Sequence, residues 1–354
     1  MEGKLPGIQV GRAVAAASVF YFHSYIGMTY FDQANLRPFR WLAANGASGV
    51  DLFFAISGFI VCYVAAAPDF TPATFLWKRF CRIFPLNAVV TVVIVLFTVN
   101  VSRITDDPGW LHVVQSILIL PQKVPVNSVG WTLEYEVVFY IIAAILLPLG
   151  GPRALLGYCA ASYLIAAWLN PETPVIARFI SDHHAAFGAG VLAYIVARRI
   201  PSLKAPSAWT ISILLPVMAL IIFRLGTVMP IPLRTPTACG LAVLGLAFLP
   251  WAPQWLVKFG DISYGFYLLH WPGISMMTWE AFARITPNPV AGEVWRWETF
   301  LHITLVAYLS WTYFEHPINR WARSASRRYF RAAVHDPAGT VDLVDVPASS
   351  LGSR

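Results

Sequence analysis

One arginine and one histidine lie on the same face of the first apolar stretch of the chain. Arg12 and His23 are eleven residues apart, and eleven residues turn an α-helix to within about 20° of three whole turns. The two side chains therefore lie about 16 Å apart along one helix face. Imidazole suits proton transfer near neutral pH, so we interpret His23 as a candidate general base. The alternative is that Arg12 reaches lipid phosphate and His23 only hydrogen-bonds a neighbouring helix.

Four acids and a second histidine also occur in or beside apolar stretches. Asp51 begins the stretch after Gly49, where it could also serve only as a charge at a helix N-terminus. Glu134 and Glu136 are two positions apart and point to nearly opposite faces of a helix, so we expect only one of them to face the protein interior. His270 and Glu315 are candidates either for helix–helix hydrogen bonds or for the site.

Three cations come just before Pro85, at the start of another apolar stretch. Lys78, Arg79 and Arg82 could contact lipid headgroups, but three cations at one helix entry also suit a phosphorylated ligand.

Other reactive side chains give weaker signals. His183 and His184 lie at the edge of an apolar stretch, and we interpret them as surface histidines. The four cysteines lack CxxC spacing, and we interpret them as small hydrophobic residues rather than metal ligands or disulfide partners.

The composition indicates which elements position these residues. Of 354 residues, 57% are hydrophobic and 12% are charged, which excludes a disordered chain, a coiled coil and an ordinary soluble enzyme. We predict an all-α polytopic membrane bundle with about ten transmembrane helices. The predicted spans are Val10–Tyr30, Ala47–Ala67, Phe84–Val101, Trp131–Leu149, Ala154–Leu169, His184–Ala197, Ala208–Phe223, Leu233–Pro250, Ile262–Glu280 and Phe300–Pro317.

Two segments fall outside these spans. Leu111–Leu120 is apolar but too short to cross a bilayer, so it is interpreted as a re-entrant or interfacial piece. Residues 1–323 are predicted to form the membrane domain, and residues 324–354 a basic and then polar tail that is disordered.

The distribution of positive charge predicts the orientation. The formal net charge is +7, and the basic residues cluster between apolar stretches, which favours an anionic lipid surface over nucleic acid. With ten spans both termini lie on one side, and that side holds sixteen of the 25 lysines and arginines. The sequence therefore predicts cytoplasmic termini.

These motifs, in this order, resemble the acyltransferase-3 family of integral membrane acyltransferases, which acylate cell-surface sugars. The resemblance runs from residue 8 to about residue 320. The residues of its motifs are most similar to those of the branch that O-acetylates O-antigen or exopolysaccharide. Asn87 and Glu134 depart from the residues common in that family. The matching segments are Arg12–His23, Gly49–Phe59, Arg82–Pro85, Trp131–Tyr140, Asp261–His270 and Glu315–Pro317.

The resemblance implies a multi-pass protein of the bacterial inner membrane. It further implies acetyl-CoA or another acyl-CoA as co-substrate, no permanently bound cofactor or metal, and a saccharide or lipid-linked saccharide as acceptor. His23 would deprotonate the acceptor hydroxyl or accept the acyl group itself. Asp51, Glu136 or Glu315 could orient its imidazole.

The resemblance also assigns roles to individual residues. Catalytic roles fall to His23, Glu136 and Asp51. Acyl-CoA binding falls to Arg12, Lys78, Arg79 and Arg82. Supporting roles fall to Ser57, Trp131, Tyr140, Tyr264, His270 and Glu315.

Two other functions remain open at this point. The ionisable residues in the spans could instead form the proton relay of a transporter or flippase that does no acyl chemistry. The acceptor could also be a small molecule or an oligosaccharide signal rather than a surface polysaccharide.

Overall fold

The computed structural model describes residues 5–27, 40–101, 109–169, 171–200, 203, 205–224, 231–284 and 289–335. Over these residues the chain is helical and contains no strand, which confirms the predicted all-α class. The helices are α1 (Pro6–Gly27), α2 (Arg40–Asn45), η2 (Gly46–Ser48), α3 (Gly49–Ala65), α4 (Pro72–Val101), α5 (Trp110–Ile117), η3 (Ser128–Gly130), α6 (Trp131–Leu169), α7 (Pro174–Phe179), α8 (His184–Ala197), α9 (Ala205–Arg224), α10 (Ile231–Ala247), α11 (Gln254–Arg284), α12 (Pro289–Ser310), η4 (Trp311–Glu315) and α13 (His316–His335).

Four helices in the described part of the chain are long and apolar enough to cross a bilayer. They are Ala43–Ala65, Pro72–Phe97, Ser128–Leu169 and Ala205–Arg224. These four cover all or most of five of the ten predicted spans, so the structure supports a membrane protein but does not confirm ten transmembrane helices.

The other predicted spans lie in helices that are shorter or more polar. Helix α8 has 14 residues, about 21 Å of helix against a hydrocarbon core of about 30 Å. Helix α12 carries Glu293, Arg296 and Glu298 in its first turns. Residues 28–30, at the end of the first predicted span, lie outside the described residues.

The fourth and fifth predicted spans form one kinked helix. Helix α6 continues from Trp131 to Leu169, and the turn expected between the two spans is a kink at Gly151, where φ is 63° and ψ is −161°. Pro148 and Pro152 flank the kink. Proline cannot donate the backbone hydrogen bond of a regular helix, so the change of direction falls between them.

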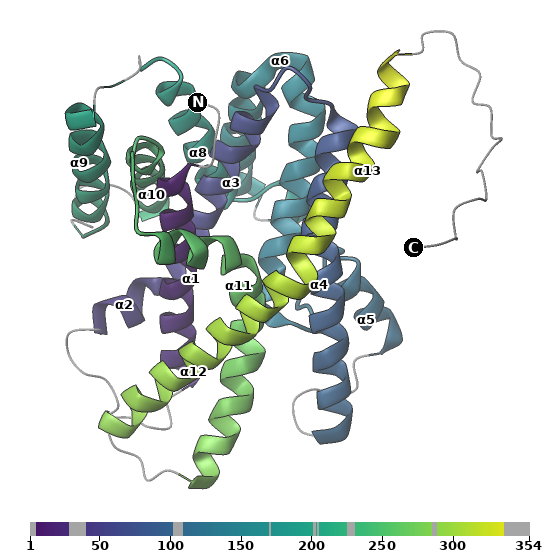
Figure 1. The fold of residues 1–354 in the computed structure, drawn as a ribbon, viewed down its shortest axis with the longest axis vertical. Coiled ribbons are helices and arrows are strands. Elements are labelled where there is room, and N and C mark those ends of the chain that lie inside the picture. The colour runs from purple at the N-terminus through teal and green to yellow at the C-terminus, as the bar shows by residue number, and fades with distance from the viewer. Residues whose placement is uncertain are drawn as a thin grey trace, which may run out of the picture.

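Helix α1 lies in the middle of the bundle (Figure 1). It packs against α3, α10 and α11, whereas α9 lies at one edge and packs against α10. The residues that α1 presents are therefore surrounded by other helices rather than by lipid.

The backbones of α3 and α8 touch through glycines. A Cβ atom on Gly58 would lie 2.1 Å from the carbonyl oxygen of Phe187, and one on Gly190 would lie 1.8 Å from that of Ala55. Only glycine permits so close an approach, which is a common device for packing helices in membranes. It fixes the position of Ser57, which precedes Gly58.

Helix α5 is short, as the apolar segment at Leu111–Leu120 predicted. The buried Asn87 of α4 donates hydrogen bonds to the carbonyl oxygens of Ser116 at 2.8 Å and Ile117 at 3.3 Å. These are carbonyls at the end of α5, which have no partner within the helix. Asn87, one of the two departures from the family pattern, therefore joins α4 to α5.

The predicted boundary between membrane domain and tail falls inside a helix. Helix α12, the π-helical turn η4 and helix α13 follow one another almost without a break and cross α4 (Figure 1). Residues 324–335 are thus helical rather than disordered, since they extend the last turns of α13 beyond residue 323. Residues 336–354 of the predicted tail lie outside the described residues.

Candidate active site

Five helices enclose a cavity of about 200 Å³, which we call the inner cavity. Its wall comes from the start of α1, from α3, α4 and α6, and from α11, so four segments of the predicted motifs meet α1 at one place. The polar side chains in this wall are Gln9, Arg12, Ser57, Arg79, Arg82, Thr132, Glu136, Tyr140, Tyr264 and Tyr267.

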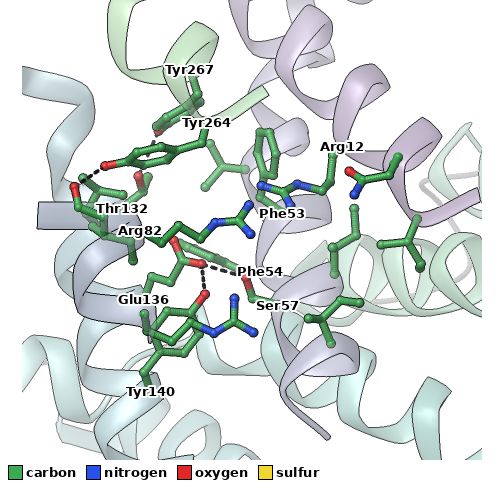
Figure 2. A pocket seen from close by; sticks show the side chains of 18 residues that line it. Arg12, Phe53, Phe54, Ser57, Arg82, Thr132, Glu136, Tyr140, Tyr264 and Tyr267 are labelled. Carbon is green, nitrogen blue, oxygen red and sulfur yellow. Dashed lines mark hydrogen bonds between the residues drawn. The ribbon is translucent and has the colours of Figure 1, made fainter. Parts of the chain in front are cut away.

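Glu136 is the acidic residue of this wall. Ser57 Oγ donates a hydrogen bond to Glu136 Oε1 at 2.9 Å, and the Tyr140 hydroxyl donates to the same oxygen. Figure 2 shows Arg12 and Arg82 reaching toward each other from opposite sides, next to this carboxylate. Arg79 also lines the cavity, with its guanidinium 5.0 Å from the centre of the Tyr140 ring.

The charge of the inner cavity favours an anionic or strongly dipolar ligand. Three guanidinium groups surround a single carboxylate, so positive charge is in excess. Guanidinium groups bind phosphate and carboxylate oxygens through paired hydrogen bonds. Charges enclosed among apolar helices are costly, so their convergence marks a functional site.

The tyrosines of α11 hold this helix against two others. Tyr264 donates from its hydroxyl to the carbonyl oxygen of Ile83 in α4 at 2.6 Å. The Tyr267 hydroxyl lies 3.0 Å from Thr132 Oγ1 and donates to the carbonyl oxygen of Val129 at 3.2 Å. The two rings therefore form one end of the inner cavity and fix the register of the helix that carries His270.

His23 and His270 form a hydrogen-bonded pair beyond Tyr267. His23 Nδ1 lies 2.9 Å from His270 Nε2, and Nδ1 of His270 donates to the carbonyl oxygen of Tyr267. His270 is 1% exposed, and the Trp271 ring packs against His23 at 5.2 Å between centres.

These contacts determine which nitrogen of His23 is free to act as a base. His270 Nδ1 faces a carbonyl oxygen, which can only accept, so that nitrogen carries the proton. In neutral His270, Nε2 is then an acceptor, and His23 Nδ1 must be the donor. The lone pair of His23 is therefore on Nε2, pointing away from the pair.

A proline in α11 shapes the backbone next to this pair. Pro272 has no N–H to donate to the carbonyl of Leu268, four residues earlier. Asn127 Nδ2 donates to that carbonyl at 2.9 Å from the segment before α6. The irregular turn of α11 is thus satisfied by a side chain, and His270 keeps a fixed position.

Glu315 lies at the end of the π-helical turn η4. It is 4% exposed and accepts a hydrogen bond from Ser310 Oγ at 3.1 Å. A Cβ atom on Gly265 would lie 2.7 Å from Glu315 Oε1, so a larger residue there would displace the carboxylate from its place beside α11. Single π-helical turns occur often at functional sites.

The structure brings many of the predicted site residues together. Those in the wall of the inner cavity are Arg12, Ser57, Arg79, Arg82, Glu136, Tyr140 and Tyr264. His23 and His270 lie beyond Tyr267, and Lys78 lines a second cavity that shares Arg79 and Arg82.

Two predicted residues lie elsewhere. Asp51 is in the first turn of α3 and is not among the residues that line the inner cavity. Trp131 packs its ring against Tyr135 at 5.8 Å and against His183 at 5.2 Å. Among the described hydrogen bonds none joins His23 to a carboxylate, so the partner of His23 is His270 rather than any of the three predicted acids.

The prediction that only one of the two glutamates faces the interior is wrong, because Glu134 is buried and Glu136 lines the inner cavity. Glu134 is 1% exposed and accepts a 2.8 Å hydrogen bond from Arg178 Nε in an ion pair. Arg178 also donates to the Tyr135 hydroxyl at 3.0 Å and to the Gln122 carbonyl at 3.1 Å. The two glutamates do occupy different helix faces, but neighbouring helices cover each face.

His184 is also buried, against the prediction of a surface residue. It is 0% exposed, and its Nδ1 lies 3.0 Å from Ser162 Oγ. His183 packs against the rings of Phe54, Trp131 and Tyr135. Tyr158 and Ser162 of α6 cover the His184 ring, and composition alone does not show this contact. The four cysteines are buried, as expected of small hydrophobic residues.

Sequence reasoning missed a second buried charge cluster. Arg296 of α12 is 1% exposed, donates to Ser24 Oγ at 2.9 Å and to the Tyr21 hydroxyl at 3.2 Å, and forms an ion pair with Glu293. The arginine and glutamate are three residues apart in an otherwise apolar segment, which is a signal that could have revealed them. The cluster joins α12 to α1 beside His23.

Together the fold and site define a helical membrane protein with a cation-lined cavity next to a histidine pair. The family model described as an acyltransferase domain, that of the acyltransferase-3 family, matches residues 5–315. The chain therefore belongs to the acyltransferase-3 family, as its motifs predicted, and the prediction of an O-acyltransferase is confirmed.

Three curated sequences are similar to this chain. Acyltransferase MdmB of Streptomyces mycarofaciens is 25% identical over 257 residues, which cover 70% of this chain and 62% of MdmB. BcsY of Komagataeibacter xylinus, whose name describes a membrane-bound transacylase, is 26% identical over 79% of this chain and 76% of its own. The exopolysaccharide production protein ExoZ of Rhizobium meliloti is 27% identical over 79% of this chain and 91% of its own. No solved structure is significantly similar to the chain.

Proposed function

We propose that this protein transfers an acetyl group from acetyl-CoA to a hydroxyl group of a cell-surface saccharide, either an exopolysaccharide or its lipid-linked precursor. One observation carries the proposal. The arginine-lined inner cavity ends at Tyr267, and the backbone carbonyl of Tyr267 holds the His270–His23 pair. An anion site and a candidate base therefore adjoin within the bundle.

The donor enters from the side on which α1 begins. The helix rise separates Arg12 from His23 by about 16 Å, so a donor whose anionic end lies on the Arg12 side and whose thioester reaches His23 must be long and thin. A pantetheine arm has this shape. The excess of lysine and arginine on the terminus side supports placing that side in the cytoplasm of a bacterial inner membrane, where acyl-CoA is available.

The proposed reaction needs one base. His23 Nε2 takes the proton of the acceptor hydroxyl, the oxygen attacks the thioester carbonyl carbon, and the C–O bond forms as the C–S bond breaks. The coenzyme A thiolate leaves and takes the proton from His23. A second route first places the acyl group on His23 and then transfers it to the hydroxyl.

Two other residues hold the reacting or binding groups in position. Glu136, held by Ser57 and Tyr140, keeps the surrounding guanidinium groups in place and limits their mutual repulsion. His270 holds the reactive tautomer of His23. No step is assigned to Asp51.

The acceptor class is proposed from the relatives. ExoZ is named for exopolysaccharide production, and it is similar to this chain over 91% of its own length. A saccharide hydroxyl would approach His23 from the end of α1 opposite the termini.

Membranes that contain the wild-type chain, His23→Ala or the control His302→Ala test this proposal with labelled acetyl-CoA and a lipid-linked saccharide pool. His302 is an exposed histidine of α12. His302→Ala therefore makes the same substitution as His23→Ala at a position away from the site. We expect label in the saccharide fraction with the wild type and His302→Ala, and none with His23→Ala.

Other outcomes would contradict the proposal. Equal labelling with His23→Ala would remove His23 from the mechanism. Label on a small molecule in place of the saccharide would contradict the acceptor class, and saccharide movement across the membrane without labelling would favour a transporter.

A further inference from the structure

A second cavity of about 480 Å³ lies between α4 and α13, and we call it the outer cavity. It faces the side on which α1 begins, where α4 also starts. Its basic and polar side chains come from two facing helices: Lys78, Arg79 and Arg82 from α4, and His316, Asn319 and Arg323 from α13.

The α13 residues form one face of that helix. His316, Asn319 and Arg323 are spaced by three and four residues, which places them on the same side. The helix is held against α4 because Trp77 Nε1 donates to the carbonyl oxygen of Ala322 at 3.2 Å, and the Trp77 and Trp321 rings pack 5.6 Å apart. The family match ends at residue 315, so this wall lies beyond it.

The outer and inner cavities share two residues. Arg79 and Arg82 line both, so a cationic surface continues from α13 to Glu136. A ligand with phosphates at one end and a reactive group at the other can therefore lie along both cavities.

The rest of the outer wall favours a nucleotide over a bare phosphate or a lipid headgroup. Trp311, Phe70 and Phe75 supply aromatic surface on which a base can stack. Asp69 and Asp261 lie in the same wall, and their carboxylates can accept hydrogen bonds from amino or hydroxyl groups. A site for phosphate alone would gain nothing from these acids.

We propose that the outer cavity binds the 3′-phosphorylated adenosine diphosphate end of the acyl-CoA donor, and that Arg323 of α13 pairs with one of its phosphates. This inference rests on the proposed function, because it takes the donor to be an acyl-CoA. It makes α13 part of the donor site and not merely a tail.

The test measures binding to the purified full chain in nanodiscs of zwitterionic lipid, with acetyl-CoA and S-acetylpantetheine as probes. S-Acetylpantetheine has the same thioester arm but lacks the nucleotide and all phosphates. The variants are Arg323→Gln, Arg323→Lys and the control Arg320→Gln, which removes an equal charge from an exposed residue of α13 that is not among those lining the cavity.

We expect Arg323→Gln to weaken acetyl-CoA binding about tenfold, since it removes a hydrogen bond between charged groups. Arg323→Lys should lose less, Arg320→Gln should match the wild type, and S-acetylpantetheine should bind all four proteins equally. This pattern would support the inference even in a protein whose acceptor is unknown.

Three results would overturn it: unchanged acetyl-CoA binding by Arg323→Gln, an equal loss with Arg320→Gln, or an equal loss of S-acetylpantetheine. Anionic lipid that displaces acetyl-CoA from the wild type but not from Arg323→Gln would assign the cavity to a headgroup instead. A wild type that binds neither probe would refute the proposed donor itself, which separates that failure from failure of the nucleotide site.

Discussion

Replacing His270 by phenylalanine tests how His23 is prepared for proton transfer. The substitution keeps an aromatic ring at a position that is 1% exposed, but it removes both the acceptor nitrogen for His23 and the donor to the Tyr267 carbonyl. His23 Nδ1 then loses the partner that selects its tautomer. The variant therefore keeps the His23 imidazole but no longer fixes the proton on its Nδ1.

The size of the effect follows from one hydrogen bond. The 2.9 Å contact between His23 Nδ1 and His270 Nε2 joins two neutral rings away from water, and a buried group left without its partner costs about 1–3 kcal/mol. At about 1.36 kcal/mol for each factor of ten, kcat should fall roughly 5- to 150-fold. The KM for acetyl-CoA should change little, because His270 is not among the residues that line the inner cavity.

The assay is steady-state acetyl transfer by His270→Phe, by His270→Gln and by the control His184→Phe, which removes a buried imidazole from α8. His270→Gln offers an amide acceptor and should retain more activity than His270→Phe. His184→Phe should lower the thermal midpoint without a matching loss of kcat.

A double variant supplies the result that would refute the reasoning. If His270 acts through His23, then adding His270→Phe to His23→Gln should change the residual rate by less than about twofold, because groups that act as a unit are not additive. An equal loss in both backgrounds would mean that His270 has only a structural role. A loss confined to KM would mean that it contributes to donor binding.

Three further predictions concern binding and stability. Arg82→Gln should raise the KM for acetyl-CoA about tenfold or more in donor titrations, since it removes a cation from both cavities; an unchanged KM would contradict the donor path. Glu134→Gln should destabilise the fold by about 3–5 kcal/mol in chemical unfolding by leaving Arg178 buried without its partner. The double variant Glu134→Gln/Arg178→Met should recover part of that loss. Gly58→Ala should lower the thermal midpoint, because its Cβ would meet the Phe187 carbonyl oxygen at 2.1 Å; an unchanged midpoint would show that α3 and α8 can separate freely.

The helical class and much of the site were predictable because they depend on local patterns. An eleven-residue spacing places Arg12 and His23 on one face whatever surrounds the helix. The motif residues Ser57, Arg82, Glu136 and Tyr264 meet in one cavity, although their separations in the sequence do not say which will touch.

What the sequence did not reveal depends on packing between distant segments. The orienting partner of His23 is another histidine 247 residues away, and nothing in the spacing ranks it above the acids. Arg178 lies between two predicted spans, where a surface position is expected, yet it is buried against Glu134. The helix over residues 324–335 was not foreseen because α13 turns polar in composition while its inner face still packs on α4.

Irregular backbone is concentrated around this site, and the motifs explain why. In a bilayer, broken helices are tolerated only where protein groups satisfy the freed backbone atoms. Helix α4 contains Pro85, whose missing N–H leaves the Cys81 carbonyl without its helix partner, and Tyr264 donates to the nearby Ile83 carbonyl. Helix α11 carries Pro272, and the Leu268 carbonyl accepts from Asn127.

The turn η4 is also irregular backbone beside the site, but its irregularity is a π-helical turn rather than a proline. The π-helical turn ends at Glu315, whose carboxylate lies beside Gly265 of α11. The prolines of α4 and α11 and this turn therefore need no contact with substrate to matter for the site. Close to Pro85 and Pro272, side chains of other segments hydrogen-bond to backbone carbonyls and so join the bundle at the level of the cavity. A variant that removes one of these hydrogen bonds should consequently lose donor binding and stability together, whereas a variant that removes only a charge should lose donor binding alone.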